Sequence, residues 1–106
     1  MLILGNFKEI LFVKLFLIHC GYYDSEICDG LYESHCNFFV VAESFEEARK
    51  TAKALPQFQQ KRMHIDGLQE VQAVQGYTIS LNHSPELRGE SLVVSHKHRD
   101  LAPQKS

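Results

Sequence analysis

The sequence predicts an α+β fold, in which an antiparallel β-sheet carries one main α-helix on one face in the order β-β-α-β-β. A chain of 106 residues has the length of one domain. Residues 10–18 and 38–42 are apolar runs typical of strands, and a single clear helical pattern follows them at residues 44–55. Two further strand patterns come after the helix. Strands grouped around one helix are typical of this fold class.

The first predicted strand, residues 10–18, is apolar throughout except for Lys14. A continuous apolar run is typical of a strand that is buried on both faces. Residues 20–37 are rich in turn-forming residues, among them Gly21, Asp29, Gly30 and Asn37. We therefore expect a long loop there, and loops of this length are often functional.

The helix at residues 44–55 begins with a capping box, in which Ser44 and Glu47 each satisfy the other's free backbone N–H. Its apolar side chains form one stripe at helical spacing, made of Phe45, Ala48, Ala52 and Leu55. Pro56 is expected to end the helix, since proline cannot continue it. Residues 57–61 are then expected to be a polar linker.

The second half of the chain predicts two strands joined by a glycine turn. Residues 63–74 form the third predicted strand, with an irregularity at Gly67. Tyr77, Ile79 and Leu81 alternate with polar residues. The fourth strand is therefore expected to give these three side chains to the core.

The domain is expected to span residues 10–95, with a short edge strand at residues 91–95. Residues 1–9 are expected to be a leader that extends the first strand. Residues 96–106 are expected to form a polar C-terminal tail that is frayed, as chain ends often are.

Charge and cysteine usage favour a cytoplasmic protein with no nucleic-acid or membrane partner. The net charge at pH 7 is −2, which gives no general attraction to nucleic acid or to anionic membranes. The three cysteines are an odd number and cannot all pair within the chain, so reduced thiols and a cytosolic compartment are expected. Residues 1–20 are strongly apolar, but charged residues interrupt the run, unlike in a membrane helix or a signal peptide. A membrane or export segment is the alternative for this stretch.

Four residues have side chains suited to binding a divalent metal ion or another small ligand. Glu33 and His35 share one face if their segment is extended, and His64 and Asp66 share one face of the third strand. Histidine nitrogen and carboxylate oxygen are common metal ligands, so two such pairs at neighbouring strand ends could form one site. Alternatively, His64 and Asp66 are ordinary polar residues of a half-exposed strand, or Asp66 orients a turn at Gly67.

Cysteine chemistry has less support from the sequence. The spacing of Cys20, Cys28 and Cys36 fits no standard zinc site, which uses closer pairs. His19 and His35 each precede a cysteine directly, so on strands each histidine points away from its neighbour. Buried structural thiols are therefore expected, and a pairing of Cys20 with His35 is the alternative.

Two further groups of residues suit contact with a partner. Tyr22 and Tyr23 are expected in the long loop, where a tyrosine can bury area and keep its polar tip exposed. Packing of the loop over the sheet explains them equally well. The basic segment at residues 96–99 suits contact with phosphate or RNA, but the net acidic chain argues against a nucleic-acid function.

Several motifs of the chain together resemble a small bacterial family that is known as a domain of unknown function, number fifteen forty-three. The motifs are L-F-L-I-H-C-G-Y-Y, E-S-H, F-F-V-V-A-E-S-F-E-E-A, M-H-I-D and V-Q-G-Y-T-I-S-L, and they cover about residues 10–82. Ser34, Gln75 and the pair His19–Cys20 depart from the family pattern, and the first two weaken any site built on those positions. Many relatives carry two such units in tandem, whereas this chain carries one. The resemblance therefore implies pairing of two single-unit chains into a homodimer.

The leading functional prediction is a non-catalytic homodimeric module that binds a protein partner or a small ligand. The expected ligand-binding residues are Glu33, His35, His64, Asp66, Tyr22 and Tyr23. A single helix covers only one sheet face, while the first two strands look apolar on both, and a second copy of the chain is the simplest cover for the other face. A metal-assisted hydrolase that uses the same His/carboxylate groups is the alternative. The sequence names no catalytic residue and no cofactor, and a wide separation of His35 from His64 would exclude the hydrolase.

Overall fold

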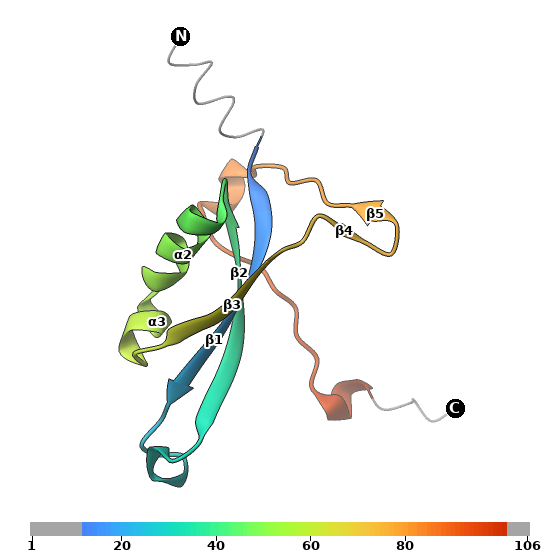
Figure 1. Ribbon diagram of the computed structural model, residues 1–106. Helices are drawn as coiled ribbons and strands as arrows, with labels where there is room; N and C mark the ends of the chain where they lie inside the picture. Colours follow the sequence, from blue (N-terminus) through green and yellow to red (C-terminus); the bar gives the residue numbers. More distant parts are fainter. Residues whose placement is uncertain (1–11, 102–106) are drawn as a thin grey trace, which may run out of the picture.

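The computed structural model describes residues 12–101 and confirms the α+β fold (Figure 1). Its central sheet has three antiparallel strands in the order β2-β1-β3, and a second, two-stranded sheet follows in the chain. The strands are β1 (Lys14–Tyr23), β2 (Glu33–Ala42), β3 (His64–Glu70), β4 (Ala73–Val74) and β5 (Tyr77–Thr78). The helices are α2 (Phe45–Lys53) and α3 (Pro56–Gln60), with 3₁₀ turns η1 (Cys28–Gly30), η2 (Pro85–Leu87) and η3 (His98–Leu101).

Strand β1 is the centre of the fold because it pairs with β2 on one side and with β3 on the other. Alternate residues of β1 are fully buried on the face that α2 and α3 cover: Phe16, Ile18 and Cys20. The helices add Ala48, Ala52 and Phe58 to the same core, and β2 adds Val40 and Ala42. The period of two along the strand thus divides β1 into a core face and an open face.

The first two strands are longer than predicted, and the long loop expected at residues 20–37 is wrong in its extent. β1 pairs with β2 from Lys14 with Ala42 to Tyr23 with Glu33, so only residues 24–32 connect them. Turn-forming residues inside this pairing therefore adopt extended backbone, because pairing with the neighbouring strand overrides a weak local preference.

Helix α2 begins where the capping residues predict. The Ser44 side chain accepts a hydrogen bond from the backbone N–H of Glu47 at 3.1 Å, and Ser44 itself is extended. This bond satisfies one of the free N–H groups of the first turn. Ala48 and Ala52 are fully buried, whereas Phe45 is 49 % exposed and Leu55 is partly buried, so the predicted stripe is confirmed at its two alanines.

The polar linker expected at residues 57–61 is wrong, because Pro56 begins a helix there. Helix α2 ends at Lys53, and Pro56 is the first residue of α3. Proline is well placed at the first helical position, where its missing N–H has no bond to lose. Phe58 on this short helix is only 7 % exposed and completes the core.

The irregularity predicted at Gly67 is confirmed. The register of β1 with β3 shifts between His19, which pairs with Gly67, and Cys20, which pairs with Ile65. Asp66 is therefore the extra residue of a β-bulge, and a bulge of this kind redirects side chains at the edge of a sheet.

The glycine turn is also confirmed, although the strands around it are short. Gln75 and Gly76 both have positive φ, of 51° and 87°, between the paired residues Val74 and Tyr77. Two consecutive positive φ values are typical of a two-residue type I′ hairpin, and glycine meets that requirement at little cost.

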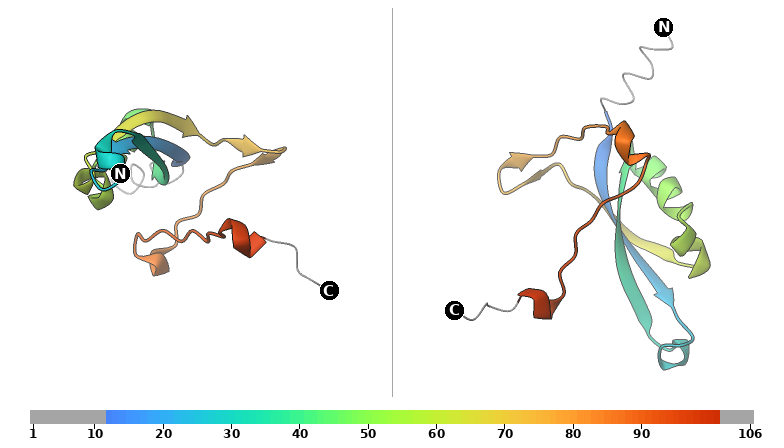
Figure 2. Two further views of the ribbon diagram at one scale, coloured as in Figure 1. Left: turned by 90° about the horizontal axis from the view of Figure 1, so that it is seen from below. Right: turned by 180° about the vertical axis from the view of Figure 1, so that it is seen from behind.

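The prediction that Tyr77, Ile79 and Leu81 belong to the core is wrong. Their exposed fractions are 77 %, 37 % and 36 %. The β4–β5 hairpin projects away from the central sheet, so the alternating pattern has no core to face (Figure 2). The edge strand expected at residues 91–95 is also absent from the secondary structure, and Leu92 and Val94 are 80 % and 84 % exposed.

The end of the chain is polar as predicted, and its described part contains η3. The leader at residues 1–9 and the last part of the tail, residues 102–106, lie outside the described residues. Within residues 12–101, no helix has the length and apolar character needed to cross a membrane.

The sheet face opposite the helices carries a row of apolar side chains. Leu15 pairs with Val41 and Leu17 pairs with Phe39, so these four lie together on the open face of β1 and β2. Val41 and Phe39 are 49 % and 53 % exposed. The prediction that the first strands are apolar on both faces therefore agrees with the structure.

Candidate functional site

The four residues predicted as a site lie on one face at one end of the central sheet. Gly21 of β1 pairs with His35 of β2 and with His64 of β3. Glu33 lies two residues before His35, and Asp66 lies two residues after His64. The strand register therefore brings both predicted pairs to either side of Gly21. We call Glu33, His35, His64 and Asp66 the His/carboxylate cluster.

Within the His/carboxylate cluster, each carboxylate contacts both imidazoles. Glu33 Oε1 lies 2.6 Å from His35 Nε2, and Glu33 Oε2 lies 2.7 Å from His64 Nε2. Asp66 Oδ1 lies 3.1 Å from His64 Nε2, and Asp66 Oδ2 lies 3.4 Å from His35 Nε2. His35 and His64 thus share one site, and the hydrolase is not excluded by their separation.

Gly21 forms the floor of the cluster because it has no side chain. A Cβ built on Gly21 would lie 2.7 Å from His64 Nε2, 2.8 Å from Asp66 Oδ2 and 2.8 Å from Glu33 Oε2. Real Cβ atoms essentially never approach other heavy atoms this closely. Glycine is therefore required here for three polar atoms to converge over one point of the backbone.

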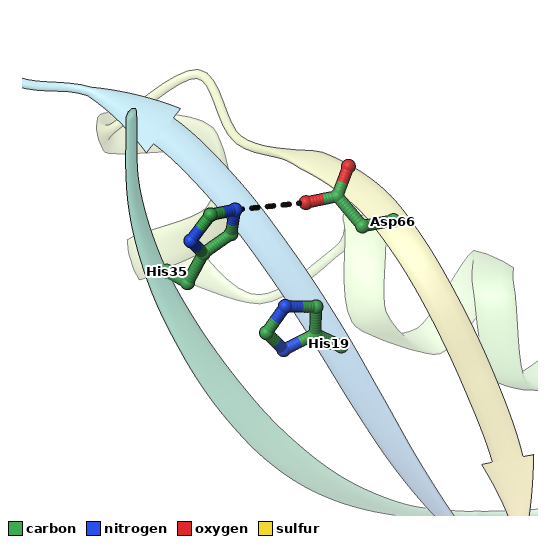
Figure 3. Close-up of side chains that lie close together, drawn as sticks. All are labelled: His19, His35 and Asp66. Atoms are coloured by element: carbon green, nitrogen blue, oxygen red, sulfur yellow. Dashed lines mark ion pairs between the residues drawn. The ribbon is translucent and has the colours of Figure 1, made fainter. Parts of the chain in front are cut away.

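His19 extends the cluster along β1, although it was not among the predicted ligand-binding residues. Its ring is stacked on that of His35, with centroids 5.0 Å apart and 16° between the planes. Its Nδ1 lies 2.8 Å from Asn37 Oδ1. Figure 3 shows His19, His35 and Asp66 on three neighbouring strands, with their side chains on the side away from the helices. His19 lies two residues before Gly21, and this spacing was the available signal that both share a face.

The cluster is open to solvent. The exposed fractions of the side chains are 43 % for His35, 46 % for His64, 34 % for Asp66 and 28 % for Glu33. Ion pairs at this level of exposure contribute little to folding stability. Stability alone therefore gives little reason for two histidines and two carboxylates to converge here.

Cys20 and Cys36 lie on the other face of the sheet. Cys20 is fully buried in the core, and Cys36 Sγ lies 3.8 Å from the sulfur of Met63. Burial raises the pKa of the Cys20 thiol to about 11, helped by the nearby Cys36 and Asp66, and burial also raises the pKa of Cys36. These thiols are packed away from the imidazoles, which agrees with structural thiols and not with a cysteine–histidine pair.

Alkylation of the folded protein is expected to label Cys28 rapidly and Cys20 very slowly. Cys28 is exposed, whereas Cys20 is fully buried. In addition, a rise from 9.0 to about 11 lowers the thiolate fraction of Cys20 at neutral pH about 100-fold. Mass spectrometry of iodoacetamide-labelled peptides at pH 7.5 measures both rates. Equal labelling of the two cysteines in the folded protein would contradict the burial of Cys20.

The two tyrosines predicted as site residues are separate from the cluster. Tyr22 lies on β1 and not in a loop, with Lys61 Nζ 5.0 Å from its ring centroid. Tyr23 ends β1 and is 58 % exposed. The structure therefore brings together four of the six predicted ligand-binding residues. Tyr22 and Tyr23 lie at the end of β1, next to the loop that connects it to β2.

Two shallow grooves border the cluster. One, of about 580 Å³, runs along the edge strand β3 and includes His64, Asp66, Arg49 and Lys53 in its lining. The other, of about 400 Å³, lies on the open sheet face and includes His19 in its lining. A ligand larger than an ion therefore has room on both sides of the cluster.

Comparison with known families gives one match. Residues 30–81 match the model of the family described as Domain of Unknown Function (DUF1543). The match confirms the family resemblance and contains all four residues of the His/carboxylate cluster, whereas Gly21 and His19 precede it. Comparison with curated proteins and with solved structures found no match. The family description assigns no activity, so function has to be argued from the site.

Proposed function

We propose that this DUF1543 chain is a non-catalytic, homodimeric module that binds a divalent transition-metal ion at the His/carboxylate cluster. One observation carries the proposal. His64 Nε2, Asp66 Oδ2 and Glu33 Oε2 all lie 2.7–2.8 Å from the point where a Gly21 Cβ would stand. A nitrogen and two oxygens that converge on one position, kept clear by a glycine, form a suitable cradle for a cation.

The chemistry of the three donors supports a transition metal of the zinc or manganese type. Imidazole nitrogen suits zinc and its neighbours, and carboxylate oxygen is accepted by the same ions. Such ions hold their ligands at about 2.0–2.2 Å, which places neighbouring ligand atoms about 3 Å apart. Glu33 Oε2 and Asp66 Oδ1 already lie 2.7 Å and 3.1 Å from His64 Nε2.

Metal titration of the dialysed full chain tests this proposal. We expect wild-type protein to bind Zn²⁺ or Mn²⁺, measured by calorimetry and by elemental analysis after gel filtration. His64→Gln is expected to weaken binding on the order of 100-fold or more, because loss of even an outer-shell partner costs about 10–100-fold. A ligand that binds only the folded protein should also raise its melting temperature.

His83→Gln is the matched control, since His83 is exposed and lies outside the helices and strands. It should bind metal as the wild type does. Absence of binding by the wild type, or equal binding by His64→Gln and the wild type, would overturn the proposed metal site.

The groove along β3 favours a metal-assisted hydrolase as the second candidate. Arg49 and Lys53 line this groove together with His64 and Asp66, so an anionic substrate could lie beside the metal. With three protein ligands, a catalytic metal keeps a position for water and lowers its pKa. Turnover of p-nitrophenyl phosphate by the Zn²⁺- or Mn²⁺-loaded protein that is lost in both His64→Gln and Arg49→Ala would favour the hydrolase. Metal binding without turnover of such esters would favour the binding module.

The open apolar face supports the homodimeric part of the proposal. Phe39 and Val41 are about half exposed and lie beside Leu15 and Leu17 across the strand pair. All four side chains are uncharged, so two copies of this face can meet about a two-fold axis without like-charge repulsion. Each copy would cover the face that the helices of its own chain leave open.

Sedimentation at micromolar concentration is expected to show a dimer for the wild type and a 12.2 kDa monomer for Phe39→Asp. A charge in the centre of an apolar interface is costly to bury, whereas it is solvated in the free monomer. Leu92→Asp is the control, because Leu92 is 80 % exposed and lies outside the sheet. A wild type that sediments only at 12.2 kDa would refute the dimer.

The cysteines support the cytoplasm as the compartment of the module. Cys20, Cys28 and Cys36 are all free thiols in the structure. Unpaired thiols are typical of proteins in reducing compartments.

A further inference from the structure

We propose that the site holds two divalent cations, bridged by carboxylates, with His19 and His35 binding the second ion. This inference rests on the proposed metal-binding function and adds a second site to it. Two groups of three metal-ligating residues have ligand atoms within 4.8 Å of one another. The first is Glu33, His64 and Asp66, and the second is His19, His35 and Asp66. Asp66 belongs to both groups.

The carboxylates are oriented as bridges between two positions. Asp66 directs Oδ1 to His64 and Oδ2 to His35, at 3.1 Å and 3.4 Å. With two ions bound, Oδ1 would therefore be its ligand to the first ion, and Oδ2, which lies 2.8 Å from the Gly21 Cβ position, would turn to the second. Glu33 does the same with Oε2 to His64 and Oε1 to His35, at 2.7 Å and 2.6 Å. A carboxylate that gives one oxygen to each of two cations holds them about 3.5–4 Å apart, as in known two-metal sites. The imidazoles of His64 and His35 would therefore each bind one of the two ions of a single two-metal site.

His19 supplies the second imidazole at the His35 end. Asn37 Oδ1 lies 2.8 Å from His19 Nδ1, and an amide oxygen can only accept, so Nδ1 donates its proton. This leaves the lone pair of His19 Nε2 available to a metal ion, because the bond made by one ring nitrogen sets the role of the other. The stacked arrangement of His19 on His35 places the two rings side by side beside Asp66 (Figure 3).

The placement of Asn37 gives this end of the site a supporting shell. Metal-binding histidines commonly donate their second ring N–H to a carbonyl or carboxylate oxygen, which fixes the ring and its tautomer. Asn37 lies two residues after His35 on β2 and opposite His19 on β1, so the strand register holds it in place. Asn37 is thus a positioning residue for the second ion, and it acts through His19.

Stoichiometry separates this inference from the proposed function. Titration of the dialysed full chain with Mn²⁺, followed by elemental analysis, is expected to give two ions per wild-type chain and one per His19→Gln chain. Electron paramagnetic resonance should show exchange-coupled Mn²⁺ in the wild type and an isolated ion in His19→Gln. Circular dichroism verifies that the exposed His19→Gln substitution leaves the fold intact.

The variants at Asn37 test the supporting shell. Asn37→Ala should weaken binding of the second ion about 10–100-fold and leave the first unchanged. Asn37→Asp should restore it, because a carboxylate also accepts a hydrogen bond from Nδ1. One ion in both wild type and His19→Gln, or two ions in both, overturns the second site. No ion in the wild type overturns the proposed function as well.

Discussion

Substitution of Gly21 by alanine is expected to abolish high-affinity metal binding while the protein remains folded. The new Cβ would stand 2.7–2.8 Å from one nitrogen and two oxygens of the His/carboxylate cluster, so these donors must move apart. All three are the ends of side chains and can shift without moving backbone. We expect the metal affinity to fall on the order of 100-fold, comparable to loss of a ligand. The free energy of unfolding should change by no more than about 1 kcal/mol, since alanine is also the better strand residue.

Gly67→Ala is the matched control for Gly21→Ala. Gly67 lies on the neighbouring strand β3, next to Asp66, and a Cβ built there meets nothing within 4 Å. Calorimetric titration with Zn²⁺ and urea unfolding of both variants measure affinity and stability separately. Equal metal affinity in Gly21→Ala and the wild type would show that the convergence over Gly21 is not where the ion binds.

Truncation of Phe16 to alanine is expected to destabilise the protein by about 3–5 kcal/mol. Phe16 is fully buried near the start of β1, and the centroids of its ring and of the Phe45 ring of α2 lie 5.0 Å apart in an edge-on arrangement. The substitution removes this contact and leaves a cavity where sheet and helix meet. A domain of this size has about 5–15 kcal/mol of stability in total, so much of it would be lost.

Tyr77→Ala is the contrasting control and is expected to change stability by no more than about 0.5 kcal/mol, because Tyr77 is 77 % exposed. Urea unfolding followed by circular dichroism, at several protein concentrations, measures both changes and reveals any linkage to dimerisation. A large loss in Tyr77→Ala would mean that the hairpin packs against something in solution. A small loss in Phe16→Ala would contradict the position of the core.

Gly21→Ala is expected to alter metal binding and Phe16→Ala to alter stability, because the two faces of β1 meet the site and the core, respectively. Its residues Phe16, Ile18 and Cys20 face the helices. His19 lies on the open side, and the donors of the His/carboxylate cluster converge over Gly21. Changes on one side should therefore alter stability, and changes on the other should alter binding. This separation lets metal affinity be studied in variants that still fold.

Four residues of the candidate site could be predicted from the sequence. Spacing by two residues placed Glu33 with His35 and His64 with Asp66 on shared faces, and a strand has a side-chain period of two whatever it pairs with. The pattern did not include Gly21 and His19. Their roles depend on which residues of β2 and β3 lie opposite them, and a strand sequence carries little information about its register.

The loop predicted at residues 20–37 and the core strand predicted at residues 77–81 were wrong for a similar reason, because contacts distant in the sequence decided both. Residues 20–37 hold many turn formers, yet Gly21, Ser34 and Asn37 among them are paired in β1 and β2, since pairing along the whole strand outweighs single preferences. Tyr77, Ile79 and Leu81 alternate as a buried strand would, but their hairpin lies beyond the sheet. Alternation shows which side chains share a face, and it does not show whether anything covers that face.

The sequence by itself determined what depends on neighbours along the chain. The cap at Ser44, the buried stripe of α2 and the positive-φ turn at Gly76 are local, because each is satisfied by atoms a few residues away. Only the tertiary structure decided the site. The pairing of β1 with β2 and β3 places Gly21 beneath the converging donors and His19 beside His35, and these contacts join residues that are far apart in the chain.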